Sequence, residues 1–438
     1  MAGFVKLLRD NPSYRYTWFG QIVSEIGDHF NNIAVFSLAM HATSTGMVTT
    51  GSGIVVTGVM LARAVPAIGM GPFAGLALDR LNRKHVMIAS DLVRAVVALG
   101  FILCLGRHDT WLLYLLSALL MAASPFFTSG RSAILPTIAS PEELHTANSI
   151  TQTTQWVTTA AGAFLGGASV ARFGYEVAFL FNAASFLFSA ICIWQLRPVR
   201  GSFRVERTDL TEDRVMRPWR EYAAGLRYMR SHPLILGIAL IGVGWATGGG
   251  AAQILFSLFG ELVFQRGAAG IGQIWGAAGV GLVLGGILAH RYGKQMSFAN
   301  YKRTISICYL IHGSTYVIFS QMHHYGWALF FIGISRASVA ITTVLNYSQL
   351  LTHVADEYRG RVFSTIESMV WSTMMLSMMG AGIASEQHSP RTIGAAAGIL
   401  SSMTAIFWGW ANWKGRLPEP ARDGVEPDEV EVRGNTVA

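Results

Sequence analysis

Charged side chains are scarce in this chain of 438 residues: they make up 13% of the total, about half the share usual in soluble proteins. Hydrophobic residues account for 52%, and the mean hydropathy is +0.40. This balance excludes an ordinary soluble protein of two or three domains and predicts a polytopic membrane protein. Glycine is abundant instead, with 47 residues. Helices in a membrane often pack through such small residues.

Cysteine is also scarce, because Cys104, Cys192 and Cys308 are the only three and lie far apart inside apolar runs. No C-x-x-C pair or Cys/His cluster occurs, so we expect buried free thiols. The sequence likewise lacks a nucleophile elbow, a Walker loop, metal-ligand spacing and a dinucleotide fingerprint. We therefore predict a protein that is not an enzyme and that binds no cofactor and no metal.

Twelve apolar segments are long enough for membrane-spanning helices, which need about 20 residues each. The first is too long and too polar for a cleaved signal peptide. The segments cover residues 14–41, 48–78, 84–105, 111–134, 144–171, 174–196, 234–261, 268–290, 300–321, 327–351, 361–384 and 391–413. The predicted fold is all-α, with twelve transmembrane helices.

The lysines and arginines predict how these helices are oriented. Basic residues concentrate before the first segment, after the last and in every second loop, whereas the alternate loops hold only Arg107, Arg172, Arg266 and Arg391. The formal charge of +8 therefore indicates membrane topology rather than nucleic-acid binding. We expect a monomer in the inner (cytoplasmic) membrane with both termini cytoplasmic.

The chain divides near its middle. Residues 1–197 and 233–415 form the two predicted six-helix bundles, and the polar residues 198–232 form a cytoplasmic linker. Within the linker, residues 218–230 are amphipathic, which predicts a helix on the cytoplasmic membrane surface; a solvated linker helix is the alternative. Residues 416–438 are acidic and contain proline and glycine, so we predict a disordered tail.

A short repeat supports this division. The loop after the second segment reads GLALDRLNRK and the loop after the eighth reads GILAHRYGK, which ends at Lys294. Gly75 would let two helices approach closely, and Asp79 would accept hydrogen bonds from a facing helix N-terminus. The basic residues would anchor the turn at the cytoplasmic face: Arg80, Arg83 and Lys84. Repeats of this kind are typical of secondary transporters.

The first loop resembles the signature G-x-x-x-D-[R/K]-x-G-[R/K]-[R/K] of the major facilitator superfamily, with Asn82 replacing the second glycine. In the second copy, His290 replaces the aspartate. Residues 129–150, 162–167, 178–190 and 358–364 also resemble the branch that includes enterobactin exporters and macrolide-efflux proteins, although Ala163 stands where that branch commonly has proline. The resemblance implies a midplane cavity lined by helices one, four, seven and ten, and transport by alternating access.

Four polar residues lie on one face of the first segment: Gln21, Glu25, Asp28 and Asn32. A charge near the bilayer centre costs about 2.5–3.5 kcal/mol on insertion scales, so this face should meet protein, water or a partner. Asp28, Arg63 and Arg336 each lie about 20 Å from the cytoplasmic ends of their helices. We predict that Glu25 or Asp28 carries the coupled proton. A static ion pair with Arg63, or a simple polar lining, is the alternative.

Further residues are candidates for the wall of the substrate cavity. Arg336 could bind an anionic group of the substrate through two hydrogen bonds, or could neutralise an acid permanently. Other candidates come from the fourth segment (Ser117 and Ser124, on one face with Met121, Thr128 and Arg131), the seventh (Trp245 and Gln253) and the tenth (Thr343 and Tyr347). With Gln21, Asn32 and Arg63, they complete the predicted lining.

Asp91 and Arg94 lie about 11 and 15 Å into the third segment and can pair at a spacing of three residues. With Asp79 and Arg83 they predict a charge cluster that holds the cytoplasmic gate shut, and Glu367 is a candidate for the same cluster.

These observations predict a proton-coupled secondary transporter that exports a small amphipathic organic compound, preferably a siderophore. No ATP-binding module is present, so an ion gradient or the substrate's own gradient must supply the energy, and protons are preferred over Na⁺. The alternatives are a multidrug or macrolide efflux pump, a lysolipid flippase and a membrane receptor or assembly partner without transport activity. The expected partners are a small organic substrate, protons and the lipid bilayer, with no nucleic acid.

Overall fold

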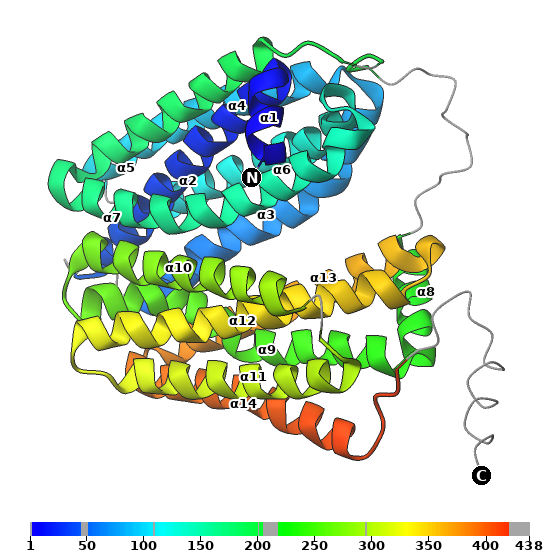
Figure 1. The fold of residues 1–438 in the computed structure, drawn as a ribbon. Helices are drawn as coiled ribbons and strands as arrows, with labels where there is room; N and C mark the ends of the chain where they lie inside the picture. Colours follow the sequence, from blue (N-terminus) through cyan, green and yellow to red (C-terminus); the bar gives the residue numbers. More distant parts are fainter. Residues whose placement is uncertain are drawn as a thin grey trace, which may run out of the picture.

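A computed structural model describes residues 2–44, 51–107, 110–199, 201–204, 218–293 and 296–419. In these ranges every regular element is helical (Figure 1). The linker residues 205–217, Lys294 of the second loop, residues 48–50 of the second predicted segment and the tail from 420 onward lie outside the described residues.

The N-terminal half begins with a short helix, which lies before the first predicted segment and which the sequence analysis did not predict. Its helices are α1 (Ala2–Asp10), α2 (Pro12–Ser44), α3 (Ser52–Arg80), α4 (Arg83–Gly100), α5 (Cys104–Arg107), α6 (Thr110–Ile138) and α7 (Pro141–Trp194). The 3₁₀ turn η1 (Phe101–Leu103) joins α4 to α5. Although α7 is continuous in hydrogen bonding, Gly174 breaks it with φ 83° and ψ 178°, which separates the fifth and sixth predicted segments.

The C-terminal half follows the helix α8 (Pro218–Ser231). Its helices are α9 (Pro233–Leu258), α10 (Gly267–Gly293), α11 (Phe298–Gln321), α12 (Tyr325–His353), α13 (Asp356–Ala384) and α14 (Pro390–Trp413), and the π-helical turn η3 (Phe259–Val263) extends α9. Among the described residues, eight helices are long and apolar enough to cross a membrane, with α7 counted once. The all-α membrane fold is thus confirmed, and the number of twelve crossings stays a prediction.

Several helix starts are encoded locally. The side-chain oxygen of Asn82 accepts hydrogen bonds from the backbone N–H groups of Lys84 and His85, at 3.0 and 3.4 Å. Asparagine therefore replaces the expected glycine of the signature loop because it caps α4. Ser140 and Glu143 form a capping box at the start of α7.

Close contacts between the two halves run along α7 and α10, and the ends of α3 and α13 also meet at the side predicted to face away from the cytoplasm. A Cβ at Gly272 of α10 would lie 2.5 Å from the carbonyl oxygen of Ala163 in α7. Between α3 and α13, the backbone N–H of Gly51 donates to Glu386. Figure 1 shows α2–α7 stacked over α9–α14, with α7 beside α10.

Toward the predicted cytoplasmic side, α3 has open space beside its glycines. A Cβ at Gly69, Gly71 or Gly75 would have no atom of the described chain within 4 Å. The close helix approach expected at Gly75 is therefore wrong for this conformation. The equivalent Gly286 in α10 does make one, because its Cβ would lie 2.6 Å from the ring of Trp156. The structure is thus open between α3 and α13 on the side predicted to be cytoplasmic.

The linker helix α8 packs on the C-terminal half. Met229 is fully buried, the guanidinium of Arg361 pairs with Glu221, and a Cβ at Gly225 would lie 2.8 Å from the carbonyl oxygen of Arg361. At the other end of this half, Leu417 is 3% exposed. The packed half therefore extends beyond residue 415, where the predicted boundary lay.

We expect Gly272→Ala and Gly75→Ala to have opposite effects on the free energy of unfolding. At Gly272 the new methyl group meets backbone atoms of Ala163 and Gly167 in α7, so the variant should lose about 1–3 kcal/mol. At Gly75 the methyl group meets open space, so stability should stay equal or rise by up to about 1 kcal/mol from helix propensity. Thermal unfolding in detergent distinguishes the two variants. Equal shifts of their unfolding temperatures would contradict the close packing of α10 against α7 at Gly272.

Candidate functional site

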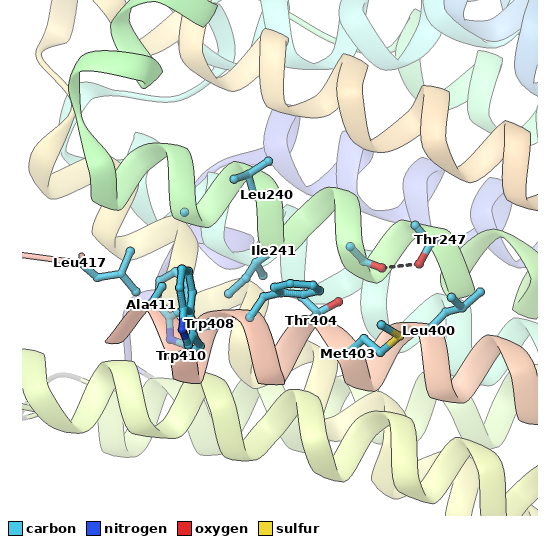
Figure 2. Close-up of a pocket in the computed structure, with 13 residues that line it drawn as sticks. Leu240, Ile241, Thr247, Leu400, Met403, Thr404, Trp408, Trp410, Ala411 and Leu417 are labelled. Carbon is cyan, nitrogen blue, oxygen red and sulfur yellow. Dashed lines mark hydrogen bonds between the residues drawn. The ribbon is translucent and has the colours of Figure 1, made fainter. Parts of the chain in front are cut away.

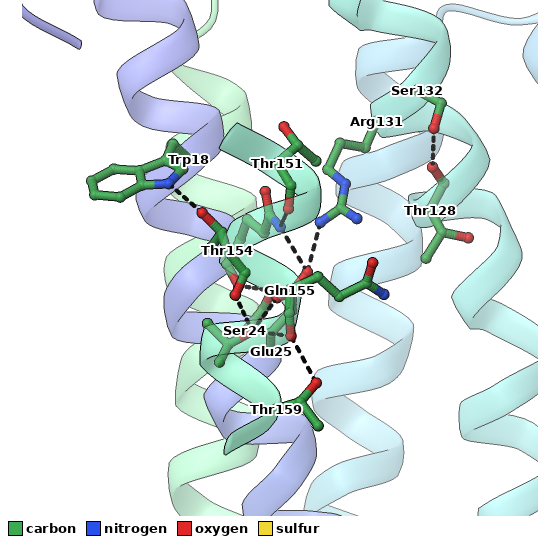
Figure 3. Close-up of polar contacts among 12 residues, drawn as sticks. Trp18, Ser24, Glu25, Thr128, Arg131, Ser132, Thr151, Thr154, Gln155 and Thr159 are labelled. Atoms are coloured by element: carbon green, nitrogen blue, oxygen red, sulfur yellow. Dashed lines mark hydrogen bonds and ion pairs between the residues drawn. The ribbon is translucent and has the colours of Figure 1, made fainter. Parts of the chain in front are cut away.

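Glu25 of α2 is the centre of a polar network that joins three helices of the N-terminal half (Figure 3). Its Oε1 accepts from Arg131 of α6 at 3.0 Å and from Gln21 at 2.9 Å. Its Oε2 accepts from the hydroxyl of Thr158 of α7 at 2.5 Å. The ion pair is mostly buried, because the side chains of Arg131 and Glu25 are 13% and 17% exposed. Three donors from α2, α6 and α7 thus hold one carboxylate in place.

Threonines of α7 also contact α2 in the turns before Glu25. The Nε1–H of Trp18 donates to Thr154 at 2.8 Å, and Gln21 donates to the carbonyl oxygen of Thr151 at 3.0 Å. The sequence placed Arg131 on the polar face of the fourth segment but gave no means of pairing it with Glu25. The threonine partners were missed, because hydroxyl groups in an apolar run carry no signal of their own.

Asp28, one turn further along α2, has a different environment. Its Oδ1 is buried and has no hydrogen-bond partner among the described residues. Arg63 of α3, which is 9% exposed, donates to the side chain of Asn32 instead, and its Nη1 is buried without a partner in the described chain. The static ion pair between Arg63 and an acid of α2, which the sequence allowed, is therefore not formed among the described residues. The acid on this face of α2 that forms an ion pair is Glu25, and its partner is Arg131.

Asn31 was missed by the sequence analysis. It is fully buried, and both polar atoms of its amide lack a partner in the described part of the chain. It lies on the face of α2 that meets the second part of α7, where a Cβ at Gly27 would lie 2.1 Å from the hydroxyl of Ser185. Unpartnered buried amides are costly, so this position favours bound water beside Asp28.

Asp91 and Arg94 form the expected ion pair, but deep in the N-terminal half. They are 0% and 3% exposed, and the guanidinium of Arg94 lies 4.5 and 4.3 Å from the ring centroids of Phe127 and Phe186. Asp79 at the end of α3 is exposed. In this conformation the pair thus lies in the aromatic core of one half, and the gate-closing cluster with Asp79 and Arg83 stays a prediction.

The remaining residues of the signature loop hold the loop to its own half. Arg83 donates to the carbonyl oxygen of Ala133 at 2.9 Å, and the ammonium of Lys84 donates to that of Leu196 at 3.0 Å. Arg80 and Glu367 are exposed. The gating role of these residues stays a prediction.

Arg336 of α12 lies in the C-terminal half with 7% of its surface exposed. Its guanidinium lies 5.0 Å from the ring centroid of Phe256, and among the described residues no carboxylate pairs with it. The hydroxyl of Tyr316, which interacts electrostatically with Arg336, is buried without a hydrogen-bond partner in the described chain. The same is true of the Nε1–H of Trp275, whose ring is edge-on to that of Phe256. Arginine and tryptophan can only donate hydrogen bonds. This surrounding is rich in donors and lacks the acid that the sequence allowed as a permanent partner.

The other predicted cavity residues divide between buried and exposed positions. Ser117 is fully buried, Ser124 donates to the carbonyl oxygen of Leu120 at 3.0 Å, and the Nε1–H of Trp245 is buried without a partner among the described residues. Gln253 is half-buried. Thr343 is exposed, and Tyr347 packs its ring 4.9 Å from that of Phe363. Their roles as lining residues stay predictions.

The described residues contain no group of three or more histidine, cysteine, aspartate or glutamate side chains that could hold a metal ion. Cys104, Cys192 and Cys308 are free and buried, as predicted.

Comparison with known proteins shows what the chain is similar to. The family model described as Major Facilitator Superfamily matches residues 17–374. The enterobactin exporter EntS of Escherichia coli O1:K1 is 25% identical, with 82% of each chain covered. The putative bacilysin exporter BacE of Bacillus subtilis is 22% identical, with 85% of this chain and 90% of that protein covered. A bacterial homologue of the iron transporter ferroportin, solved in an inward-facing state, has a similar fold at a TM-score of 0.69 and 15% identity, over 92% of this chain and 99% of that one.

We expect Arg94→Leu to destabilise the protein strongly, since it leaves Asp91 buried without its partner. Breaking a buried ion pair in this way costs about 3–5 kcal/mol. Arg361→Gln breaks the exposed pair with Glu221 and should cost at most about 1 kcal/mol. Chemical or thermal unfolding in detergent measures both. Equal stabilities would show that the Asp91–Arg94 pair does not hold the core.

Proposed function

Because the chain belongs to the major facilitator superfamily, we propose that it is a proton-coupled exporter of a small amphipathic organic compound with an anionic group, preferably a siderophore. The observation that carries this proposal is the unpaired Arg336 in the core of the C-terminal half. Export works by alternating access, with the halves rocking about a binding site between them.

The binding of an anion follows from the environment of Arg336. The guanidinium of Arg336 has no carboxylate beside it among the described residues, so an incoming oxyanion would supply the counter-charge that this arginine lacks. A carboxylate or catecholate presents two oxygens in a geometry that an arginine binds through paired hydrogen bonds. Tyr316 and Trp275 have further donors to offer. The aromatic rings of Phe256 and Trp275 suit the apolar part of an amphipathic substrate.

The choice of a siderophore rests on likeness to the enterobactin exporter, and BacE shows that a relative of similar identity is described as exporting a different compound. Siderophores are organic chelators whose oxygen donors are anionic, which fits an unpaired arginine. Compounds of the multidrug and macrolide type, which carry no such anion, remain the nearer alternative.

Proton coupling is assigned to α2, with different roles for its two acids. Glu25 is ion-paired with Arg131 and accepts two further hydrogen bonds, so its side chain is fixed between α2, α6 and α7. Asp28 has a buried oxygen without a partner, and a proton on this group would remove the cost of burying an unpaired charge. We assign the coupled proton to Asp28 and the positioning of α2 against α6 and α7 to Glu25.

The lysolipid flippase is the second candidate, favoured by one groove. A cavity of about 400 Å³ lies between α2 and α7, with Trp18, Ile22, Ile26 and Val157 among its apolar lining. Thr158, which donates to Glu25, also lines it. An acyl chain in this groove would place a lipid headgroup near the polar network.

Arg336→Gln should slow the export of an anionic siderophore by at least tenfold, because charge-assisted hydrogen bonds contribute about 1.5–3 kcal/mol. The matched control is Arg291→Gln, which removes an exposed arginine from the same half. Export is measured in cells expressing each variant, with a neutral ester of the same compound beside the acid. A variant that exports the acid and the ester at wild-type rates would contradict the assignment.

Asp28→Asn should uncouple transport from the proton gradient, since the amide can neither bind nor release a proton. We expect accumulation against the gradient to be lost in proteoliposomes, while downhill exchange of substrate continues. Glu25→Gln should slow both, because Arg131 loses its partner. Proton-driven export that persists at the wild-type rate in both variants would exclude these acids as the coupling site.

A further inference from the structure

A groove of about 480 Å³ runs along the outside of the C-terminal half between α9 and α14 (Figure 2). It is distant in the chain from the polar network of α2, and no residue of the site described above lines it. Its walls are apolar, with Leu240, Ile241, Met403, Phe407 and Trp408 on the two facing helices. Leu240 and Phe407 are 54% and 65% exposed, so in a membrane this surface meets lipid chains.

One buried polar group faces this apolar groove. Thr404 lines it and is 5% exposed, and its hydroxyl has no hydrogen-bond partner among the described residues. A threonine in a helix usually donates to the carbonyl oxygen one turn earlier, as Thr343 does at 2.9 Å. The hydroxyl of Thr404 lies against α9, because a Cβ at Gly244 would lie 2.6 Å from its oxygen, so Thr404 forms part of the floor of the groove.

Cations gather where the groove reaches the predicted cytoplasmic surface. Leu417 lines this end, and its carbonyl oxygen accepts from the ammonium of Lys302 at 3.0 Å. The guanidinium of Arg416 lies 4.8 Å from the ring centroid of Trp410, which also lines the groove. The ammonium of Lys414 lies 5.0 Å from the ring of Trp413. In the described part of the chain, neither Lys414 nor Arg416 pairs with an acid.

From this geometry we propose that the groove between α9 and α14 binds an anionic phospholipid of the cytoplasmic leaflet. One acyl chain lies along the apolar walls, over the floor that Thr404 and Gly244 form, and Lys414 and Arg416 bind the phosphate. Basic residues that close an apolar groove at the cytoplasmic surface are suited to such headgroups. Indole rings beside them fit the same depth of the membrane.

The bound lipid would join α9 to α14. These helices already touch where a Cβ at Gly248 would lie 2.2 Å from the carbonyl oxygen of Ala397, toward the opposite side. They also touch at the floor of the groove, where a Cβ at Gly244 would lie 2.6 Å from the hydroxyl of Thr404, so the lipid would cover the outer side of this contact near the predicted cytoplasmic surface. This role is independent of which compound the protein exports.

The test compares phosphatidylglycerol with phosphatidylcholine of identical acyl chains on the purified full-length protein by native mass spectrometry. We expect tighter binding of phosphatidylglycerol to the wild type. Lys414→Gln combined with Arg416→Gln should weaken it about 30-fold and leave phosphatidylcholine unchanged, at about 1 kcal/mol per cation. The matched control is Arg227→Gln combined with Arg230→Gln, which removes two exposed arginines from α8 and should preserve the preference.

A second pair of variants tests the apolar part. Leu240→Trp should fill the groove and reduce the binding of both lipids, whereas Leu310→Trp on α11 changes a leucine of similar exposure, 53%, outside it. Equal affinity of the wild type for the two headgroups, or a preference that survives the loss of Lys414 and Arg416, would overturn the proposal. Identical effects of the two tryptophan variants would exclude this groove as the place of the acyl chain.

Discussion

The cost of a charge inside a membrane protein organises this structure, because each ionic group there needs a partner. Two pairs meet this requirement within the N-terminal half: Glu25 with Arg131, and Asp91 with Arg94. Arg63 has an amide as its partner, and Arg336 has an aromatic ring. The Glu25–Arg131 pair joins α2 to α6, and the Asp91–Arg94 pair lies within α4. In the proposal, the groups without an ionic partner bind what passes between the halves. The proposed function follows from this division.

The two halves are similar in architecture but differ in their signature loops. Gly286 packs tightly against Trp156, while Gly75 faces open space and Asp79 is exposed. If the halves rock about the close contact between α7 and α10, α3 approaches α13 when the predicted cytoplasmic side closes. Gly75 and Asp79 would then gain the contacts that the sequence predicts for them. Glycine at position 75 is thus explained by the opposite conformation rather than by this one.

The fold could be predicted from the sequence to a large extent. Apolar segments, basic loops and the repeat located the helices, and Gly174 separates two of them where a break was expected. Partners across helices could not be predicted. The spacing of Glu25 and Asp28 placed both on one face, but it could not show that Arg131 would reach Glu25 and leave Asp28 without an ion pair. Nor could depth along α4 reveal that Arg94 lies between two phenylalanines rather than at a gate.

The most direct test of the account is a structure of the protein with a bound anionic siderophore. The account predicts an oxyanion of the ligand at hydrogen-bond distance, about 3 Å, from the guanidinium of Arg336. The oxyanion would lie either beside the ring of Phe256 or on the side of the guanidinium that faces away from this ring. A ligand bound elsewhere, with Arg336 paired to an acid of the protein itself, would contradict the claim that the unpaired arginine selects the substrate.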